Sequence, residues 1–182
     1  MALDYNPDMP LFLPPLSLAG IIGIIAAVVG LSSAFQMIQK RLKLQIGASS
    51  YIWALHFFLL GGYTESLMQL GIGTRTWVSI YLKRSVFAVT TYLTVSSLGF
   101  LSILYFTWQG PLSILPTLAA INSTVAYLFG NIQMRLMFFI SSLCWIISGY
   151  YLHSRPIIIA ETIGICMNLL GIWRVIKEEK RQ

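Results

Sequence analysis

The sequence predicts an all-α integral membrane protein with seven transmembrane helices. Hydrophobic residues make up 57% of its 182 residues, charged residues make up only 10%, and the mean hydropathy is +0.75. A soluble domain carries roughly 25% charged residues, so this composition excludes a soluble globule. Seven spans of about 20 residues need about 140 residues, which leaves room for short loops and tails but for no second domain.

Apolar runs between charged and turn residues place the seven spans in order along the chain. The segment before the first span contains Asp4 and Asp8 and no basic residue. A cleavable signal peptide has a positive flank there, so we expect the first helix to be retained. The spans are predicted at residues 12–36, 44–61, 64–82, 86–106, 112–130, 134–152 and 156–175.

The breaks between these spans alternate between basic and neutral or acidic residues. Every second break, together with the carboxyl-terminal tail, is basic: Lys40, Arg41, Lys43, Lys83, Arg84, Arg135, Arg174, Lys177, Lys180 and Arg181. The remaining breaks hold Glu65, two glycine-containing turns at 61–62 and 109–111, and a single cation, Arg155. By the positive-inside rule, the amino terminus is predicted outside and the carboxyl terminus in the cytoplasm.

Two short matches predict an internal repeat. A shift of about 92 residues lays the S-S-x-x-W segment at 49–53 over the one at 141–145, and a shift of 93 lays 70–72 over 163–165. The second shift places Met68 opposite Glu161 and Arg75 opposite Asn168. Spans one to three therefore match spans five to seven, and the intervening fourth span makes the two sets parallel. The alternative is chance similarity in an apolar chain rich in serine and aromatic residues.

The predicted organisation is a single membrane domain of residues 1–182. Residues 12–82 form the first three-helix repeat, residues 86–106 a linker helix, and residues 112–175 the second repeat.

Five segments together resemble the YgjV family of bacterial inner membrane proteins. They are RLKLQ at 41–45, HFFLLG at 56–61, GIGTRTWVS at 71–79, SSLCW at 141–145 and AETIGICMNLLGIWR at 160–174. The resemblance implies an inner membrane location and a distant relation to the PQ-loop and SWEET sugar transporters and to the PnuC vitamin-precursor transporters. Those relatives have a three-one-three fold. The Pro-Gln pair of PQ-loop proteins is absent, and Pro116 resembles their bending proline in one half only.

Four polar residues at membrane depth are the first candidates for a solute site: Arg75, Glu161, Asn122 and Asn168. A charge at the centre of a span costs roughly 2.5 to 3.5 kcal/mol, so such a residue is a functional hypothesis by default. They either line a central cavity between the repeats or lock the helices together without touching a solute. Arg75 is placed closer in depth to the two asparagines than to Glu161, from which about 10 Å of helix rise separates it.

Trp53, His56 and Trp145 are further candidates for the same site. Ser49, Trp53 and His56 share one face of the second span, and Ser141 and Trp145 repeat that face on the sixth. The tryptophans either stack on a sugar or heterocycle or pack between helices. His56 either titrates and couples a proton to transport, or stays neutral and bonds a carbonyl, and the second reading is preferred.

Other function classes find little support in the sequence. The net charge of +6 is explained by membrane orientation, because the basic residues form no patch interleaved with aromatics of the kind that binds nucleic acid. There are no paired carboxylates, no metal-spaced Cys/His cluster and no nucleophile beside a base, so neither an enzyme nor a cofactor is expected. Transport of a small polar solute by alternating access is predicted. The alternative is a non-transporting membrane protein that assembles with partners, and a homo-oligomer is left open.

Overall fold

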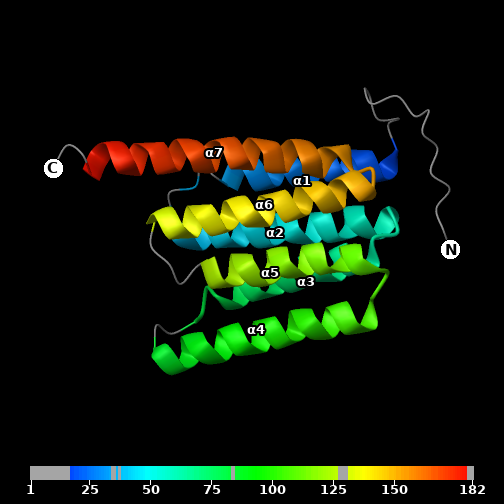
Figure 1. Cartoon of the computed structure of the whole chain (residues 1–182), viewed down its shortest axis with the longest axis horizontal. Helices are drawn as coiled ribbons and strands as arrows, with labels where there is room; N and C mark the ends of the chain where they lie inside the picture. The colour runs from blue at the N-terminus through cyan, green and yellow to red at the C-terminus, as the bar shows by residue number, and fades with distance from the viewer. Residues whose placement is uncertain (1–16, 34–35, 37, 83–84, 127–130, 180–182) are drawn as a thin grey trace.

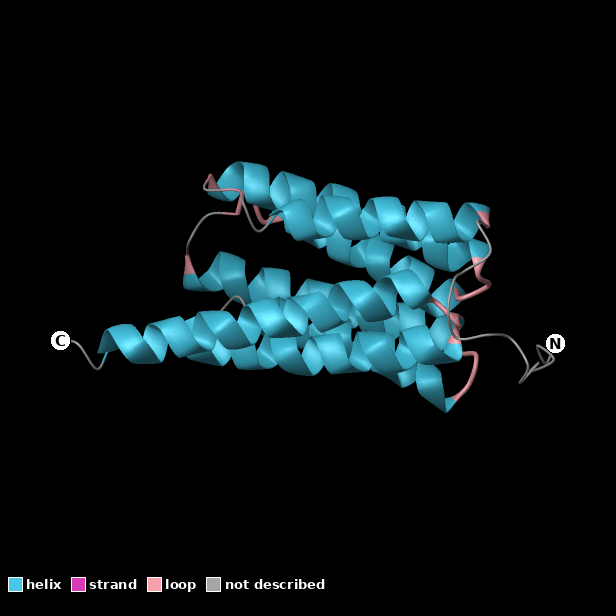
Figure 2. Ribbon diagram, turned by 90° about the horizontal axis from the view of Figure 1, so that it is seen from above, coloured by secondary structure: helices cyan, strands magenta, loops and turns pink. Residues whose placement is uncertain are grey.

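A computed structural model describes residues 17–33, 36, 38–82, 85–126 and 131–179 of the chain. Within these residues the regular structure is entirely helical, which confirms the expected all-α structure and the seven helices in order (Figures 1 and 2). The elements are α1 (Leu18–Ser32), α2 (Gln39–Leu59), α3 (Tyr63–Val78), α4 (Val86–Phe106), the short 3-10 helix η2 (Pro111–Ser113), α5 (Ile114–Ala126), α6 (Asn131–Tyr151) and α7 (Arg155–Glu179). Six of the charges used to predict orientation lie outside the described residues: Asp4, Asp8, Lys83, Arg84, Lys180 and Arg181.

Successive helices run in alternating directions, as the colour progression in Figure 1 shows. The connections therefore gather at two ends of the bundle. We call the end with the α1–α2, α3–α4 and α5–α6 connections the basic end, after the basic residues of the sequence that flank it. The α2–α3, α4–α5 and α6–α7 turns lie at the opposite end.

Local sequence explains where several helices start. The hydroxyls of Ser17 and Ser85 accept hydrogen bonds from Gly20 N at 3.1 Å and Ala88 N at 3.2 Å, which caps α1 and α4. Gly110 has φ of 129°, a conformation open to glycine, and the next residue is the proline that begins η2.

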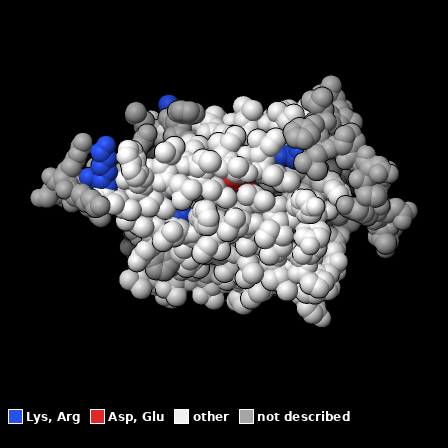
Figure 3. Space-filling view, turned by 45° about the horizontal axis from the view of Figure 1, so that its top comes forward, with Lys and Arg blue, Asp and Glu red and all other residues white. Residues whose placement is uncertain are grey.

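The outer surface of the bundle is apolar. Three helices are long and apolar enough to cross a membrane, namely Val86–Phe106, Ile132–Tyr151 and Arg155–Trp173, while α1 and the η2–α5 segment are apolar but shorter. Phe87 and Phe106 of α4 are each 82% exposed, and the face in Figure 3 shows only scattered charged atoms. Such a surface suits lipid better than water.

The interior is unusually polar. Among the described residues, 17 polar or charged side chains are buried but only 13 hydrophobic ones, and six of those 13 are alanines. Soluble proteins bury mainly hydrophobic side chains, so the bundle has the polarity expected of a protein that shields its polar groups from lipid. Glu65, which was counted among the acidic residues for the orientation, is buried in the first turn of α3, where a helix N-terminus favours negative charge.

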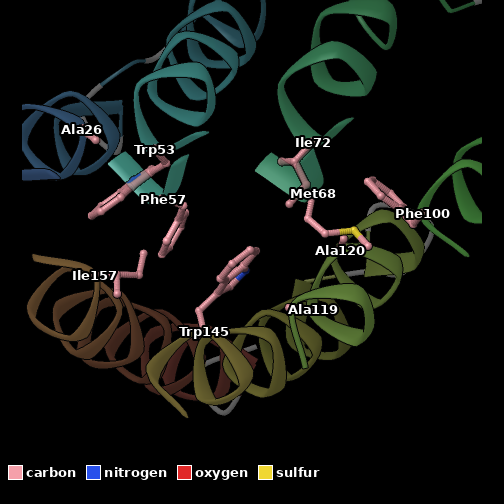
Figure 4. Close-up of a cluster of buried hydrophobic side chains, with 10 residues drawn as sticks. All are labelled: Ala26, Trp53, Phe57, Met68, Ile72, Phe100, Ala119, Ala120, Trp145 and Ile157. Atoms are coloured by element: carbon pink, nitrogen blue, oxygen red, sulfur yellow. The ribbon is translucent and has the colours of Figure 1, made fainter. Parts of the chain in front are cut away.

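The helices pack in a pattern that brings the first and last helices side by side. Helix α1 contacts α2 and α7, α3 contacts α2, α4 and α5, and α6 contacts α5 and α7. A cluster of buried apolar side chains from α1, α2, α3, α4, α5, α6 and α7 fills part of the centre (Figure 4). Helix α4 packs only at the side of this arrangement, against α3 and α5.

Small residues allow α1 to approach its neighbours closely. A Cβ atom on Gly23 would lie 2.7 Å from the His56 ring and 2.9 Å from Pro156, and one on Gly30 would lie 2.8 Å from the Ser49 hydroxyl. The glycines of α1 thus lie on a surface along which neighbouring helices pack closely.

Candidate functional site

A polar cavity of about 220 Å³ lies between the helices on the basic-end side of the bundle centre. Six of the seven α-helices contribute to its wall, and α4 does not. Arg75, Glu161, Trp53 and Trp145, four of the residues singled out from the sequence, border it together. The full lining is Gly30, Ile46, Ser49, Ser50, Trp53, Gln69, Ile72, Arg75, Thr76, Ser123, Phe138, Ser141, Ser142, Trp145 and Glu161.

The two S-S-x-x-W segments form facing walls of this cavity. A spacing of four residues places the first serine and the tryptophan of each segment on one helix face. On α2, the Ser49 hydroxyl donates to Ala26 O of α1 at 2.9 Å, and on α6 the Ser141 hydroxyl donates to Ala119 O of α5 at 3.2 Å. Helices α2 and α6, which carry the two tryptophans, are therefore each bonded to the preceding helix in the sequence through the first serine of the segment.

An aromatic stack closes the side of the cavity that faces the opposite end. Phe57 is fully buried between Trp53 and Trp145, with ring centroids 6.0 and 5.7 Å apart and interplanar angles of 28° and 20° (Figure 4). Phe57 lies one turn beyond Trp53 on α2, and it is not itself a lining residue. At a shift of 92 residues its counterpart is Gly149, where a Cβ would meet Ile157, so only one half supplies a ring here.

Arg75 joins helix α3 to helix α5 through its side chain. Its side chain is 6% exposed on α3, and its Nη2 donates to the Ser123 hydroxyl of α5 at 2.9 Å. The backbone carbonyl of Arg75 also accepts a hydrogen bond from Tyr92 of α4 at 3.1 Å. The depth estimate placed Arg75 near Asn122 and Asn168, whereas its side-chain partner here is Ser123 and Glu161 lines the same cavity.

Glu161 brings a carboxylate to the same cavity from α7. It is half-buried, and it accepts a hydrogen bond from Ser142 on the neighbouring helix α6. The Arg75 guanidinium of α3 and the Glu161 carboxylate of α7 therefore border the same cavity.

Asn122 and Asn168 stand apart from this lining. Asn122 donates through Nδ2 to Met137 O at 2.5 Å and to the Ser141 hydroxyl at 2.9 Å. Its amide therefore bonds the lining residue Ser141 without lining the cavity itself. Asn168 is half-buried on α7, two turns beyond Glu161, and is not among the lining residues.

His56 is buried at the opposite end, beyond the aromatic stack. Its Nδ1 lies 2.7 Å from Ala19 O of α1, and its Nε2 lies 2.6 Å from the hydroxyl of Ser154 in the α6–α7 turn. A carbonyl only accepts, so Nδ1 carries the proton, and the neutral ring accepts from Ser154 through Nε2. This is the carbonyl-bonded arrangement preferred from the sequence, and it ties α1 and α2 to the start of α7.

Sequence reasoning missed Gln69, Ser50, Ser142 and Phe57. Gln69 is 6% exposed and lines the cavity, whereas Met68, paired with Glu161 in the 93-residue register, is fully buried in the apolar cluster. A uniform shift of 92 residues would have paired Gln69 with Glu161 instead. Ser50 and Ser142 are the second serines of the two S-S-x-x-W segments, so the sequence repeat itself marked them as a polar position common to both segments.

A larger hollow of about 630 Å³ lies between α3 and α4. Its wall is nearly all apolar, including Phe87, Val95 and Phe100, and Arg75 is its one charged lining residue. Because this hollow offers few polar groups, it does not resemble a polar-solute site.

Comparisons with known proteins give one family. A family model described as a bacterial inner membrane protein, Imp-YgjV, matches residues 17–179. The chain is similar to inner membrane protein YgjV of Escherichia coli (strain K12), with 28% identity over 161 residues that cover 88% of this chain and 85% of that protein. No solved structure matches the chain.

Proposed function

The chain belongs to the YgjV family of bacterial inner membrane proteins, and on that premise we propose that it carries a small polar solute across the inner membrane by alternating access. In this proposal all seven helices cross the bilayer, with the amino terminus outside and the basic end in the cytoplasm. The shorter helices carry polar residues because they surround the cavity rather than face lipid.

The helix bounds support two parallel three-helix repeats joined by α4. Helix α6 begins and ends 92 residues after α2, and α7 begins 92 residues after α3. Alternating directions then make α1 parallel to α5, α2 to α6 and α3 to α7 (Figure 1). A rotation about an axis through the bundle would exchange the two sets.

The helix contacts support the same arrangement. Contacts between α1 and α7 correspond to contacts between α5 and α3, and the α1–α2 and α2–α3 pairs correspond to α5–α6 and α6–α7. The linker helix α4 lies outside this pattern. Two similar bundles that meet along two seams can rock against each other around a site between them.

The observation that carries the transport proposal is the polar cavity bordered by both sets of helices. Arg75 and Gln69 come from the first set, and Ser142 and Glu161 come from the second. Inside an apolar membrane protein, polar groups gathered around a hollow are typical of a solute pathway. In this proposal the aromatic stack separates the hollow from the opposite end, and the site faces the basic end.

A thermal-shift screen of the purified protein against a metabolite library tests the proposal, because a ligand that binds the folded form raises its apparent stability. Uptake of each hit into proteoliposomes then separates transport from binding. The Arg75→Gln variant should accumulate in the membrane and lose uptake, while Trp108→Phe, at a tryptophan that is 53% exposed, should retain it. Equal uptake by Arg75→Gln and the parent would remove Arg75 from the mechanism.

A non-transporting membrane protein that assembles with partners is the second candidate function. It is favoured by Asn122 and His56, whose side chains bond Met137 O, Ser141, Ala19 O and Ser154 and so hold helices together. On this candidate, Arg75→Gln would deplete folded protein, and no hit from the screen would be taken up by proteoliposomes.

A further inference from the structure

We infer that the solute is a small zwitterion, with one carboxylate and one ammonium group, of the size of an amino acid or a betaine; this inference rests on the proposed function. It follows from the charges of the cavity, their distribution over the two sets of helices and the volume between them.

The charges of the lining favour a solute with both signs. Arg75 and Glu161 are the charged residues of the cavity wall. A solute with only a negative charge would face the Glu161 carboxylate, and one with only a positive charge would face the Arg75 guanidinium, and juxtaposed like charges are unfavourable at low dielectric. A zwitterion matches both groups while remaining neutral overall, which also lowers the cost of bringing it into the membrane interior.

The polar groups divide into two ends of one site. Arg75 and Thr76 of α3 lie with Ser123 of α5 on the seam between those helices. The Thr76 and Ser123 hydroxyls donate to Ile72 O and Ala120 O, so the Arg75 guanidinium is the group there that would donate to a carboxylate. Glu161 of α7 lies with Ser142 and Trp145 of α6. A carboxylate and a tryptophan ring together suit an ammonium group, because the ring face attracts cations.

The volume suits a small solute. The cavity of about 220 Å³ has room for an amino acid or glycine betaine. Because the carboxylate and ammonium sites belong to different three-helix sets, such a solute would bridge the two sets, which links its binding to their relative movement.

The decisive experiment compares each zwitterion with analogues that lack one charge. Binding of the twenty amino acids and glycine betaine to the purified full-length protein would be measured by tryptophan fluorescence and by thermal shift, with D-glucose as a neutral polyol. For each hit, the amide removes the negative charge and the hydroxy acid removes the positive charge. We expect both analogues to bind at least about tenfold more weakly, as for loss of a charge-assisted hydrogen bond.

Two variants assign the charges to their partners. In Glu161→Gln the zwitterion and its hydroxy acid should bind almost equally, and in Arg75→Gln the zwitterion and its amide should do so. Lys177→Gln, which removes an exposed charge at the end of α7, should keep the parent's ratios. A purely structural role would lower binding of all probes together and leave the ratios unchanged, which would overturn the assignment. Glu161→Asp keeps the charge if the glutamine variant does not fold.

The outcomes separate this inference from the transport proposal. Binding and uptake of glucose or another uncharged metabolite, without binding of any zwitterion, would overturn the zwitterion inference and leave transport standing. Zwitterion binding without uptake into proteoliposomes would support the site and refute transport. No binding by any zwitterion, and no hit from the metabolite library, would overturn both.

Discussion

Replacing Phe57 by alanine would remove the centre of the aromatic stack. Phe57 is fully buried, and its ring stacks on two tryptophans. Truncation of a buried phenylalanine costs about 3 to 5 kcal/mol, and loss of two aromatic pairs places this site toward the upper part of that range. For a chain of this length, such a loss corresponds to a fall in the midpoint of thermal unfolding of about 10 °C or more.

The neighbouring residue provides a matched control for this prediction. Phe58 is 56% exposed on the outer surface, so Phe58→Ala removes the same atoms from a site with few protein contacts. Thermal unfolding of both variants in one detergent would be compared with the parent. A fall for Phe57→Ala no larger than that for Phe58→Ala would refute the described packing of the stack.

The same substitution should also change access to the cavity. A cysteine replacing Ser50, in a background without Cys144 and Cys166, would report access to a membrane-impermeant thiol reagent. We expect labelling from the basic end only with Phe57 present, and from both ends in Phe57→Ala. Labelling from both ends in the parent would refute the stack as a barrier.

Three further predictions concern stability, and thermal or denaturant unfolding in detergent measures each. Ser49→Ala should destabilise the protein by about 1 kcal/mol, and Ser141→Ala should cost more, because the Ser141 hydroxyl also accepts a hydrogen bond from Asn122; equal losses would argue against that second bond. His56→Leu and Ser154→Ala should show a coupling of about 1 kcal/mol in a double-mutant cycle, and additive effects would contradict the bond between them. Gly23→Ala should lower the unfolding midpoint because its Cβ meets His56 and Pro156, whereas Gly99→Ala, with open space around it, should not; equal midpoints would show that α1 can move aside.

The sequence predicted the helices better than the site. Charged and glycine-containing breaks set the number and order of the seven helices, because a helix in lipid must end where charges and turn residues begin. The family resemblance read from five short segments is confirmed by the family model over residues 17–179. The third helix ends at Val78 instead of the predicted residue 82, since an apolar run alone does not say where hydrogen bonding stops.

Within the site, positions fixed by helical spacing were predicted and positions fixed by packing were not. Trp53 and Trp145 line the cavity together, as their repeated spacing indicated. Asn168 shares a face of α7 with Glu161 but lies beyond the lining, because the length of a cavity depends on the neighbouring helices and not on one helix alone. Phe57 looked like any apolar residue, since stacking between two helices leaves no mark in a single sequence.

In the proposed carrier, the similarity of the two parallel halves does not fix the energy difference between the two access states. A rotation about an axis along the membrane normal leaves each side of the membrane in place, so even identical parallel halves would not make the two states equal in energy. The Phe57 ring lies on one side of the cavity only, and a free-energy difference of about 1.4 kcal/mol already gives a tenfold preference for one state. Under the proposed function, this single side chain would therefore influence the resting orientation without altering the charged groups that line the cavity.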